Sequence, residues 1–247
     1  SAYMLYGDGS NLTNLSGGGF EADADDNLYA SNTCSGCNLD GSAGCSNVLI
    51  GQCAGKDVTS GAYNVSFGYK AGMLATTGGQ NVFIGQRAGG EAIVTGSYNI
   101  AQGTCAGTKL TSGAANVFLG KYAGRDTSTG SNNIAIGYNA MSDTDAGSTS
   151  LGSGDNIFIG YSAGSGTWAN AASNYNVGIG NYTLDSALNG ASFNTAIGHS
   201  AGSGITTADY NTFVGSYAGQ LMTTGISNVS IGVNALLAHT TGNRNIA

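Results

Sequence analysis

Asn81-Val82-Phe83-Ile84-Gly85-Gln86-Arg87-Ala88-Gly89 is one copy of a repeat that runs through most of the chain. The repeat reads Asn, an apolar or β-branched residue, a variable residue, an apolar residue, Gly, two variable residues, Ala and Gly. Successive copies begin 17 or 18 residues apart, apart from two longer gaps of 23 and 20 residues. A short period sustained over such a length is typical of a solenoid, in which each repeat forms one coil, or rung, of a stack.

Two weaker copies precede the regular ones, at Asn11-Leu12-Thr13 and Asn27-Leu28-Tyr29-Ala30. Together the copies predict an all-β parallel solenoid of about 14 rungs, about 65 Å long at roughly 4.8 Å per rung. We divide the chain into a degenerate, Cys-containing segment (1–46) and a regular solenoid (47–247). Turn insertions are expected near 138–155 and 165–175, because extra residues in a solenoid loop outward at its turns.

The composition supports this class of fold and excludes others. The chain has 43 Gly and no Pro, and only 9% of its residues are charged. Gly without a three-residue period excludes collagen, and the absence of Pro fits a backbone whose N–H groups are engaged in sheet hydrogen bonds. An apolar fraction of 41% is sufficient for a narrow core.

The charge and hydropathy limit the partners. The formal net charge is −7, so the chain lacks the basic surface that nucleic-acid binding requires. No run of 18 apolar residues occurs, and no membrane span is expected.

The repeat also predicts the geometry of one coil, with two short strands and two turns. The first and third residues after Asn are almost all apolar, and alternation along a strand places both on one face, which we expect to be the core. The second residue is then expected to point outward. The Gly that follows each strand indicates a corner with positive φ or close approach between rungs.

Stacking in register aligns the asparagines, whose side-chain amides can hydrogen-bond from rung to rung as a ladder. We interpret this column as structural rather than as a binding site. Its predicted members are Asn47, Asn64, Asn81, Asn99, Asn116, Asn133, Asn156, Asn176, Asn194, Asn211 and Asn228.

The last copies, from Asn211 to Gly225 and from Asn228 to Gly242, resemble the repeats of phage tail-fibre-like proteins. The lead-in Gly7-Asp8-Gly9-Ser10-Asn11-Leu12 is similar to the start of such fibre repeats. The Asn-x-Val-Ala-Ile-Gly style of strand is similar to the head repeats of trimeric autotransporter adhesins. This resemblance implies a left-handed parallel β-roll and a homotrimer.

Three features are candidates for contact with a partner. Four phenylalanines on the outward-pointing column would form an apolar stripe, which is typical of interaction surfaces; covering by neighbouring side chains is the alternative. Unpaired strand edges at the ends of a solenoid predict head-to-tail assembly. The interface candidates are Phe83, Phe118, Phe158, Phe213, Tyr3, Tyr6 and Ile246. Tyrosines also recur just after the Gly corner, suited to sugars or a second protomer: Tyr69, Tyr122, Tyr138, Tyr161, Tyr182 and Tyr217.

Four of the five cysteines lie within twenty residues, and we expect one or two disulfides among them, with a metal site or free thiols as alternatives. The disulfide candidates are Cys34, Cys37, Cys45 and Cys53. Cys105 is left over, since it lies three rungs from Cys53, too far for a bond.

Little else suggests chemistry. His199 and His239 lack a partnered nucleophile, so no catalytic residue is expected. The acidic run 21–26 and Asp143, Asp145 and Asp155 offer oxygen ligands for Ca²⁺, although they match no known Ca²⁺ repeat and solvated acidic turns explain them better. Sequons make Asn11, Asn14 and Asn181 the candidate glycosylation sites.

These observations predict a non-enzymatic, extracellular or surface- or virion-associated structural protein. We expect a subunit of a rigid fibre or filament that assembles with itself through the solenoid ends or an apolar stripe. The alternative is a trimeric receptor-binding fibre shaft or adhesin head that contacts a cell-surface glycan or receptor.

Overall fold

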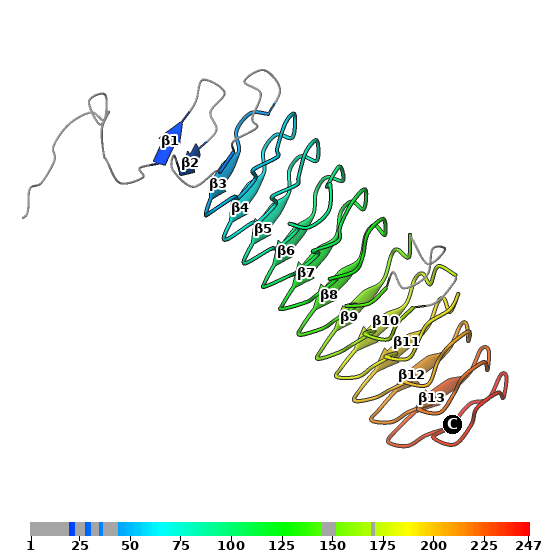
Figure 1. Cartoon of the computed structure of the whole chain (residues 1–247). Helices are drawn as coiled ribbons and strands as arrows, with labels where there is room; N and C mark the ends of the chain where they lie inside the picture. The colour runs from blue at the N-terminus through cyan, green and yellow to red at the C-terminus, as the bar shows by residue number, and fades with distance from the viewer. Residues whose placement is uncertain (1–19, 23–27, 31–34, 37–43, 145–151, 169–170) are drawn as a thin grey trace, which may run out of the picture.

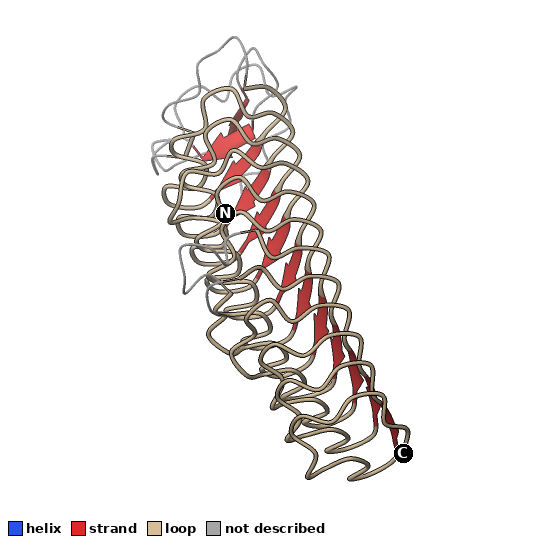
Figure 2. Ribbon diagram, turned by 90° about the vertical axis from the view of Figure 1, so that its right-hand side faces the viewer, coloured by secondary structure: helices blue, strands red, loops and turns tan. Residues whose placement is uncertain are grey.

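The computed structural model describes residues 20–22, 28–30, 35–36, 44–144, 152–168 and 171–247. These residues form a parallel β-solenoid with one row of short strands along one side of the rod (Figures 1 and 2). The predicted fold class is therefore confirmed.

Thirteen strands of three residues each follow one another in sequence order across the sheet. β1 pairs antiparallel with β2, and every later pair is parallel. The strands are β1 (Phe20–Ala22), β2 (Leu28–Ala30), β3 (Val48–Ile50), β4 (Val65–Phe67), β5 (Val82–Ile84), β6 (Ile100–Gln102), β7 (Val117–Leu119), β8 (Ile134–Ile136), β9 (Ile157–Ile159), β10 (Val177–Ile179), β11 (Thr195–Ile197), β12 (Thr212–Val214) and β13 (Val229–Ile231).

Two details of the prediction need correction. Each coil carries one strand rather than two, because the return path consists of turns whose backbone bonds run to the neighbouring coil without forming a strand. The count of about 14 rungs is also too high for the described residues. The regular stack runs from β3 to β13, and β1 leaves the parallel stack because it turns back against β2.

The asparagine that precedes each strand from β3 to β13 lies inside the coil, almost completely buried. The Oδ1 of Asn81 accepts the backbone N–H of Asn99 at 2.9 Å, and the Nδ2 of Asn81 donates to the carbonyl of Gly96 at 3.0 Å. Equivalent bonds recur from Asn47 to Asn245. The column satisfies backbone groups that would otherwise be buried without partners, which is a structural role.

The predicted orientation of the strands is wrong. The middle residue of every strand from β3 to β13 points inward, and the first and third residues point outward. The side chains proposed as an outward stripe are fully buried in the core: Phe83, Phe118, Phe158 and Phe213.

The physical reason lies in the size of the interior. A coil of 17 residues encloses a narrow interior, and the Phe residues of the strands fit into it only because the positions beside them are small. A Cβ on Gly89 would lie 2.5 Å from the ring of Phe83, and one on Gly178 would lie 2.6 Å from the ring of Phe158. Apolar residues occupy both faces of most strands, so alternation alone did not reveal the inward face.

The Gly column after each strand behaves as predicted at the corner. Gly120 has φ of +133°, and a Cβ placed there would lie 2.5 Å from the carbonyl oxygen of Gly137 on the next rung. Positive φ and close approach therefore both require Gly at this position.

The insertion near 165–175 contributes to the core rather than only to a surface loop. Trp168 is fully buried, packs edge-on against Phe158 at 5.8 Å between ring centroids, and donates from Nε1 to the carbonyl of Gly164 at 3.2 Å. Residues 145–151 and 169–170 lie outside the described part.

Candidate functional site

The outward side chains of β3–β13 form two continuous columns, which we call the strand face. The first column contains Val48, Val65, Val82, Ile100, Val117, Ile134, Ile157, Val177, Thr195, Thr212 and Val229. The second contains Ile50, Phe67, Ile84, Gln102, Leu119, Ile136, Ile159, Ile179, Ile197, Val214 and Ile231.

This face is apolar, uncharged and open to solvent. Phe67 is 53% exposed and Ile231 is 63% exposed, and the other members are half-buried by one another or moderately exposed. Only Gln102 and two threonines interrupt the apolar character, and no member is charged. Hydrophobic packing along the columns stabilises the sheet, but the outward-facing side of each side chain remains in contact with water.

The dimensions follow from sheet geometry. Eleven strands about 4.8 Å apart give a length of about 48 Å, and the two columns are about 7 Å apart. With the bordering residues at both ends of each strand, at about 3.3 Å per residue, the surface is about 20 Å wide and covers on the order of 1,000 Å², of which the two apolar columns form about half. The two apolar columns alone reach the several hundred Å² of the largest exposed apolar patches on monomers, which are often functional.

Aromatic residues border the strand face where the strands begin. The residue before each asparagine, which we call the lead column, has φ near +60° and is exposed. Its aromatic members are Tyr63, Tyr98, Tyr175, Phe193 and Tyr210. The last three stack nearly parallel, with ring centroids 4.8 Å apart for Tyr175 and Phe193 and 5.0 Å apart for Phe193 and Tyr210.

A second aromatic series borders the opposite edge, where the strands end. We call it the corner column: Tyr122, Tyr138, Tyr161, Tyr182, His199 and Tyr217. Each ring contacts the next, with centroids 5.2 to 6.0 Å apart. The sequence predicted the five tyrosines. It missed His199, which fills the place between Tyr182 and Tyr217 and shares the phase of Tyr138.

Lysines lie against the same corner. The Nζ of Lys121 lies 4.9 Å from the ring centroid of Tyr122 and 5.9 Å from that of Tyr138. Lys70 makes an equivalent contact of 5.3 Å with Tyr69, the remaining predicted tyrosine. Cation–π attraction of this kind holds the ammonium groups beside the strand face.

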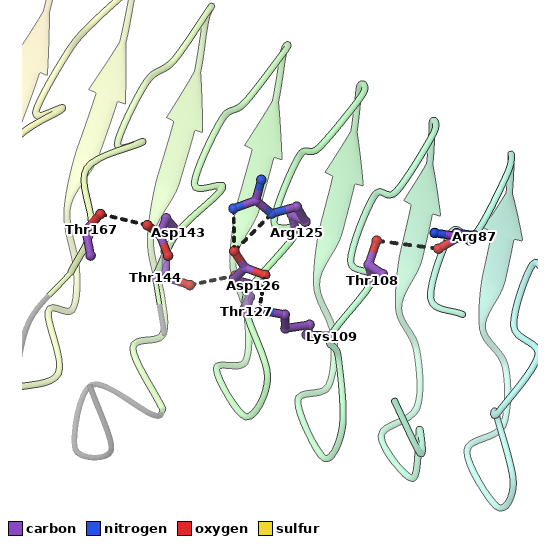
Figure 3. A network of polar contacts seen from close by, with 9 residues as sticks. All are labelled: Arg87, Thr108, Lys109, Arg125, Asp126, Thr127, Asp143, Thr144 and Thr167. Carbon is purple, nitrogen blue, oxygen red and sulfur yellow. Dashed lines mark hydrogen bonds and ion pairs between the residues drawn. The ribbon is translucent and has the colours of Figure 1, made fainter. Parts of the chain in front are cut away.

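A charged network lies farther along the turns (Figure 3). Asp126 is buried and accepts from the Nε of Arg125 at 2.9 Å, and its other oxygen lies 2.8 Å from the Nζ of Lys109. Burial disfavours the charged carboxylate, but the hydrogen bonds from Arg125 and Lys109 outweigh it and hold the pKa of Asp126 below its ordinary value.

Asp185 has the opposite behaviour. Burial raises the pKa of its carboxyl to about 6, although a backbone hydrogen bond and the nearby His199 act in the other direction. Asp185 is half-buried and follows β10 in the chain, in the turn that carries Tyr182.

The remaining predicted residues are scattered. Cys45, Cys53 and Cys105 are free thiols, whereas Cys34 and Cys37 lie outside the described residues. A disulfide between Cys45 and Cys53 is therefore absent. Asn181 is exposed, and its Oδ1 accepts the N–H of Tyr161 at 2.9 Å. Ile246 is 85% exposed beside β13. Tyr3, Tyr6, Asn11 and Asn14 lie outside the described part.

The proposed Ca²⁺ ligands that can be located have separate partners. Asp143 accepts from Thr167 at 2.7 Å, and Asp155 accepts from Asn132 at 3.1 Å. Within the described ranges, no group of three His, Cys, Asp or Glu residues is arranged to hold a metal ion. The acidic run 21–26 lies almost entirely outside those ranges.

No family model, curated protein or solved structure matches this chain. In the portion that the structure describes, no helix has the length and apolar character needed to cross a membrane.

Proposed function

We propose that this chain is a rigid, non-enzymatic rod of an extracellular or surface-associated fibre, and that copies pack side by side through the strand face. The observation that carries the proposal is the continuous apolar, uncharged surface over β3–β13. Together with its aromatic and polar borders, this surface covers about 1,000 Å² per copy, comparable to the roughly 800 Å² per partner of a stable protein–protein interface.

Stiffness follows from bonds that repeat at every level of the rod. Each strand pairs with the next, the asparagine column links neighbouring coils, and the turns exchange backbone hydrogen bonds with the coil above or below. Bending would stretch many of these bonds together, so the rod transmits force along its axis instead of flexing at one joint. End-to-end assembly through the region of Ile246 remains a prediction.

Mass photometry and sedimentation test the proposal. The double variant Ile136→Lys/Ile159→Lys places two charges in the middle of the strand face and is expected to weaken self-association at least tenfold. The matched control Thr77→Lys/Thr224→Lys adds the same charge at exposed turn positions and should associate as the wild type does. Circular dichroism verifies folding of both variants. Wild-type protein that stays monomeric at high concentration contradicts the proposal.

The two aromatic columns favour a second candidate, a receptor-binding fibre shaft or adhesin head. Exposed tyrosines at 37–43% along the corner column offer rings and hydroxyls to a glycan or a protein receptor. Tyr138→Ala/Tyr161→Ala should then abolish binding to a glycan array or a cell surface without altering self-association. Unchanged binding by this variant excludes the corner column as the receptor site.

A further inference from the structure

We propose that the copies pack antiparallel, so that the basic half of one rod lies beside the acidic half of the next. This inference rests on the proposed role of the strand face as a self-association surface. It adds the relative direction of the two rods, and it identifies a second copy of this chain as the occupant of that face.

The charges of the solenoid are segregated along its length. Six of the seven basic residues lie between residues 56 and 125, a stretch with only two acidic residues, Asp57 and Glu91. From residue 126 onward, six acidic residues accompany a single basic residue, Arg244. The change of sign falls between Arg125 and Asp126, within the coil that follows β7. Another six acidic residues precede residue 44.

Three of the six basic residues in the basic half lie beside the strand face. Lys70, Arg87 and Lys121 follow the corner glycines by one or two positions, beside the ends of β4, β5 and β7. Figure 3 shows Arg87, Lys109 and Arg125 on successive coils, with Asp143 beyond them. Lys109 is 62% exposed despite its contact with Asp126, so its ammonium group is available to a neighbour.

The acidic half holds one Arg and no Lys, and Arg244 makes no ion pair among the described residues. Asp143, Asp155 and Asp209 accept hydrogen bonds from Thr167, Asn132 and Ser192, all of which are neutral. Within the described residues, every ion pair is made by Arg87, Lys109 or Arg125, all in the basic half. In the part of the chain that the structure describes, only Asp126 of this half is paired with cations, so the basic half of a second copy can supply charge to the other carboxylates.

Antiparallel packing brings these halves together by symmetry. β8 is the middle of the eleven strands from β3 to β13. A two-fold axis along β8 places β6 of one copy opposite β10 of the other. Lys109, which follows β6, then lies at the axial level of Asp185, which follows β10, and both belong to turns that leave the same border of the paired faces. A parallel, in-register arrangement would instead place the basic halves of the two copies at the same axial level, with equivalent lysines on opposite borders of the paired faces, and like charges at one level repel.

The response to salt distinguishes the two directions. Opposite charges across an antiparallel interface attract, so raising the salt from about 50 mM to about 500 mM should weaken the dimer. Like charges across a parallel interface repel, and the same change should strengthen it. Lys121→Glu should weaken self-association at low salt, and the difference from wild type should shrink at high salt.

Distances between spin labels provide the direct test. Ala115 and Ser227 are both exposed and occupy the lead column, before β7 and β13. A nitroxide carried on a non-natural side chain avoids the native cysteines. In the antiparallel dimer the two Ala115 labels are offset axially by about two strand spacings, or about 10 Å, and the two Ser227 labels by about ten, or about 48 Å.

The outcomes are separable. A much longer distance for the Ser227 pair than for the Ala115 pair supports the antiparallel arrangement. Equal distances at both sites overturn it while leaving lateral assembly through the strand face intact. A monomer at both salt concentrations overturns lateral assembly itself, and the inference fails with it.

Discussion

The side-chain oxygen of Asn99 accepts two hydrogen bonds from Asn116, one from its backbone N–H at 3.0 Å and one from its Nδ2 at 3.0 Å. The same Nδ2 donates to the carbonyl of Gly130 at 2.9 Å, across the coil. The buried amide of Asn116 thus joins its own rung to the preceding one and also links the two sides of its own rung. Few side chains other than Asn combine this donor and acceptor capacity with so short a reach.

The first prediction concerns this bond. Asn116→Asp removes both donated bonds and places a carboxylate against two oxygen acceptors, so we expect a loss of at least about 3 kcal/mol or failure to fold. Thermal unfolding followed by circular dichroism measures the change. Asn181→Asp is the matched control, since Asn181 is exposed and uses only its oxygen as an acceptor. Equal effects of the two substitutions would contradict the structural role of the column.

The second prediction separates backbone strain from steric clash at the corner. Gly120 and Gly232 both have φ of +133°. A Cβ added at Gly120 would lie 2.5 Å from a carbonyl oxygen, whereas one added at Gly232 would meet its nearest neighbour only at 4.0 Å. Both changes to Ala carry strain on the order of 1–3 kcal/mol, and Gly120→Ala carries the clash in addition. We expect a clearly larger fall in melting temperature for Gly120→Ala.

The third prediction tests the orientation of the strands. Phe118→Ala leaves a cavity in the core and should cost about 3–5 kcal/mol. Phe67→Ala removes an outward, half-exposed ring and should cost much less in stability while weakening self-association. Unfolding and sedimentation measured on both variants check this. If Phe67→Ala proves the more destabilising, the assignment of inward and outward faces is wrong.

The fourth prediction is a pH dependence of opposite sign at two carboxyls. The pKa of Asp185 is raised from 3.8 to about 6, so its contribution to stability is present below about pH 4 and is lost as the pH rises through 6. Asp185→Asn should therefore stabilise the protein at pH 8, by about 1 kcal/mol after allowance for solvent screening, and change little at pH 3.5.

Asp126 provides the comparison for this pH series. Burial acts to raise the pKa of Asp126, but Arg125 and Lys109 lower it by a larger amount. The contribution of Asp126 to stability is therefore present above about pH 4 and is lost as the pH falls. Asp126→Asn should destabilise the protein at pH 7 and have less effect at pH 3. Melting temperatures across pH 3 to 8 that shift in the same direction for both variants would contradict these assignments.

The repeat, the asparagine column and the corner glycines could all be predicted from the sequence, because each depends on spacing alone. The inward face could not be read from apolar alternation, since Val82, Phe83 and Ile84 are all apolar. The missing signal was present nevertheless. Asn81 immediately precedes β5 and lies two residues from Phe83 in extended chain, so both share a face and a buried Asn81 requires a buried Phe83.

The contacts among surface side chains could not be predicted from the sequence, because they depend on how turns of different form align in neighbouring coils. His199 joins the corner column because turns of slightly different form bring two adjacent sequence positions to one border: Tyr161 follows the corner Gly directly, and Tyr182 follows it by two residues. Trp168 enters the core from an insertion, against the general tendency of insertions to loop outward. The separation of charge along the chain can be read from the sequence alone. Its consequence for packing between rods follows only from the order in which the coils stack.

The sizes of the inward side chains also restrict how such a rod can change its length. From β5 to β9 the interior alternates between Phe83, Ala101, Phe118, Ala135 and Phe158. Deleting or duplicating one repeat here would set two rings, or two methyl groups, on adjacent rungs, whereas deleting or duplicating two preserves the order. During evolution, repeats in this block are therefore expected to be gained or lost two at a time, which changes the length of the rod in steps of about 10 Å.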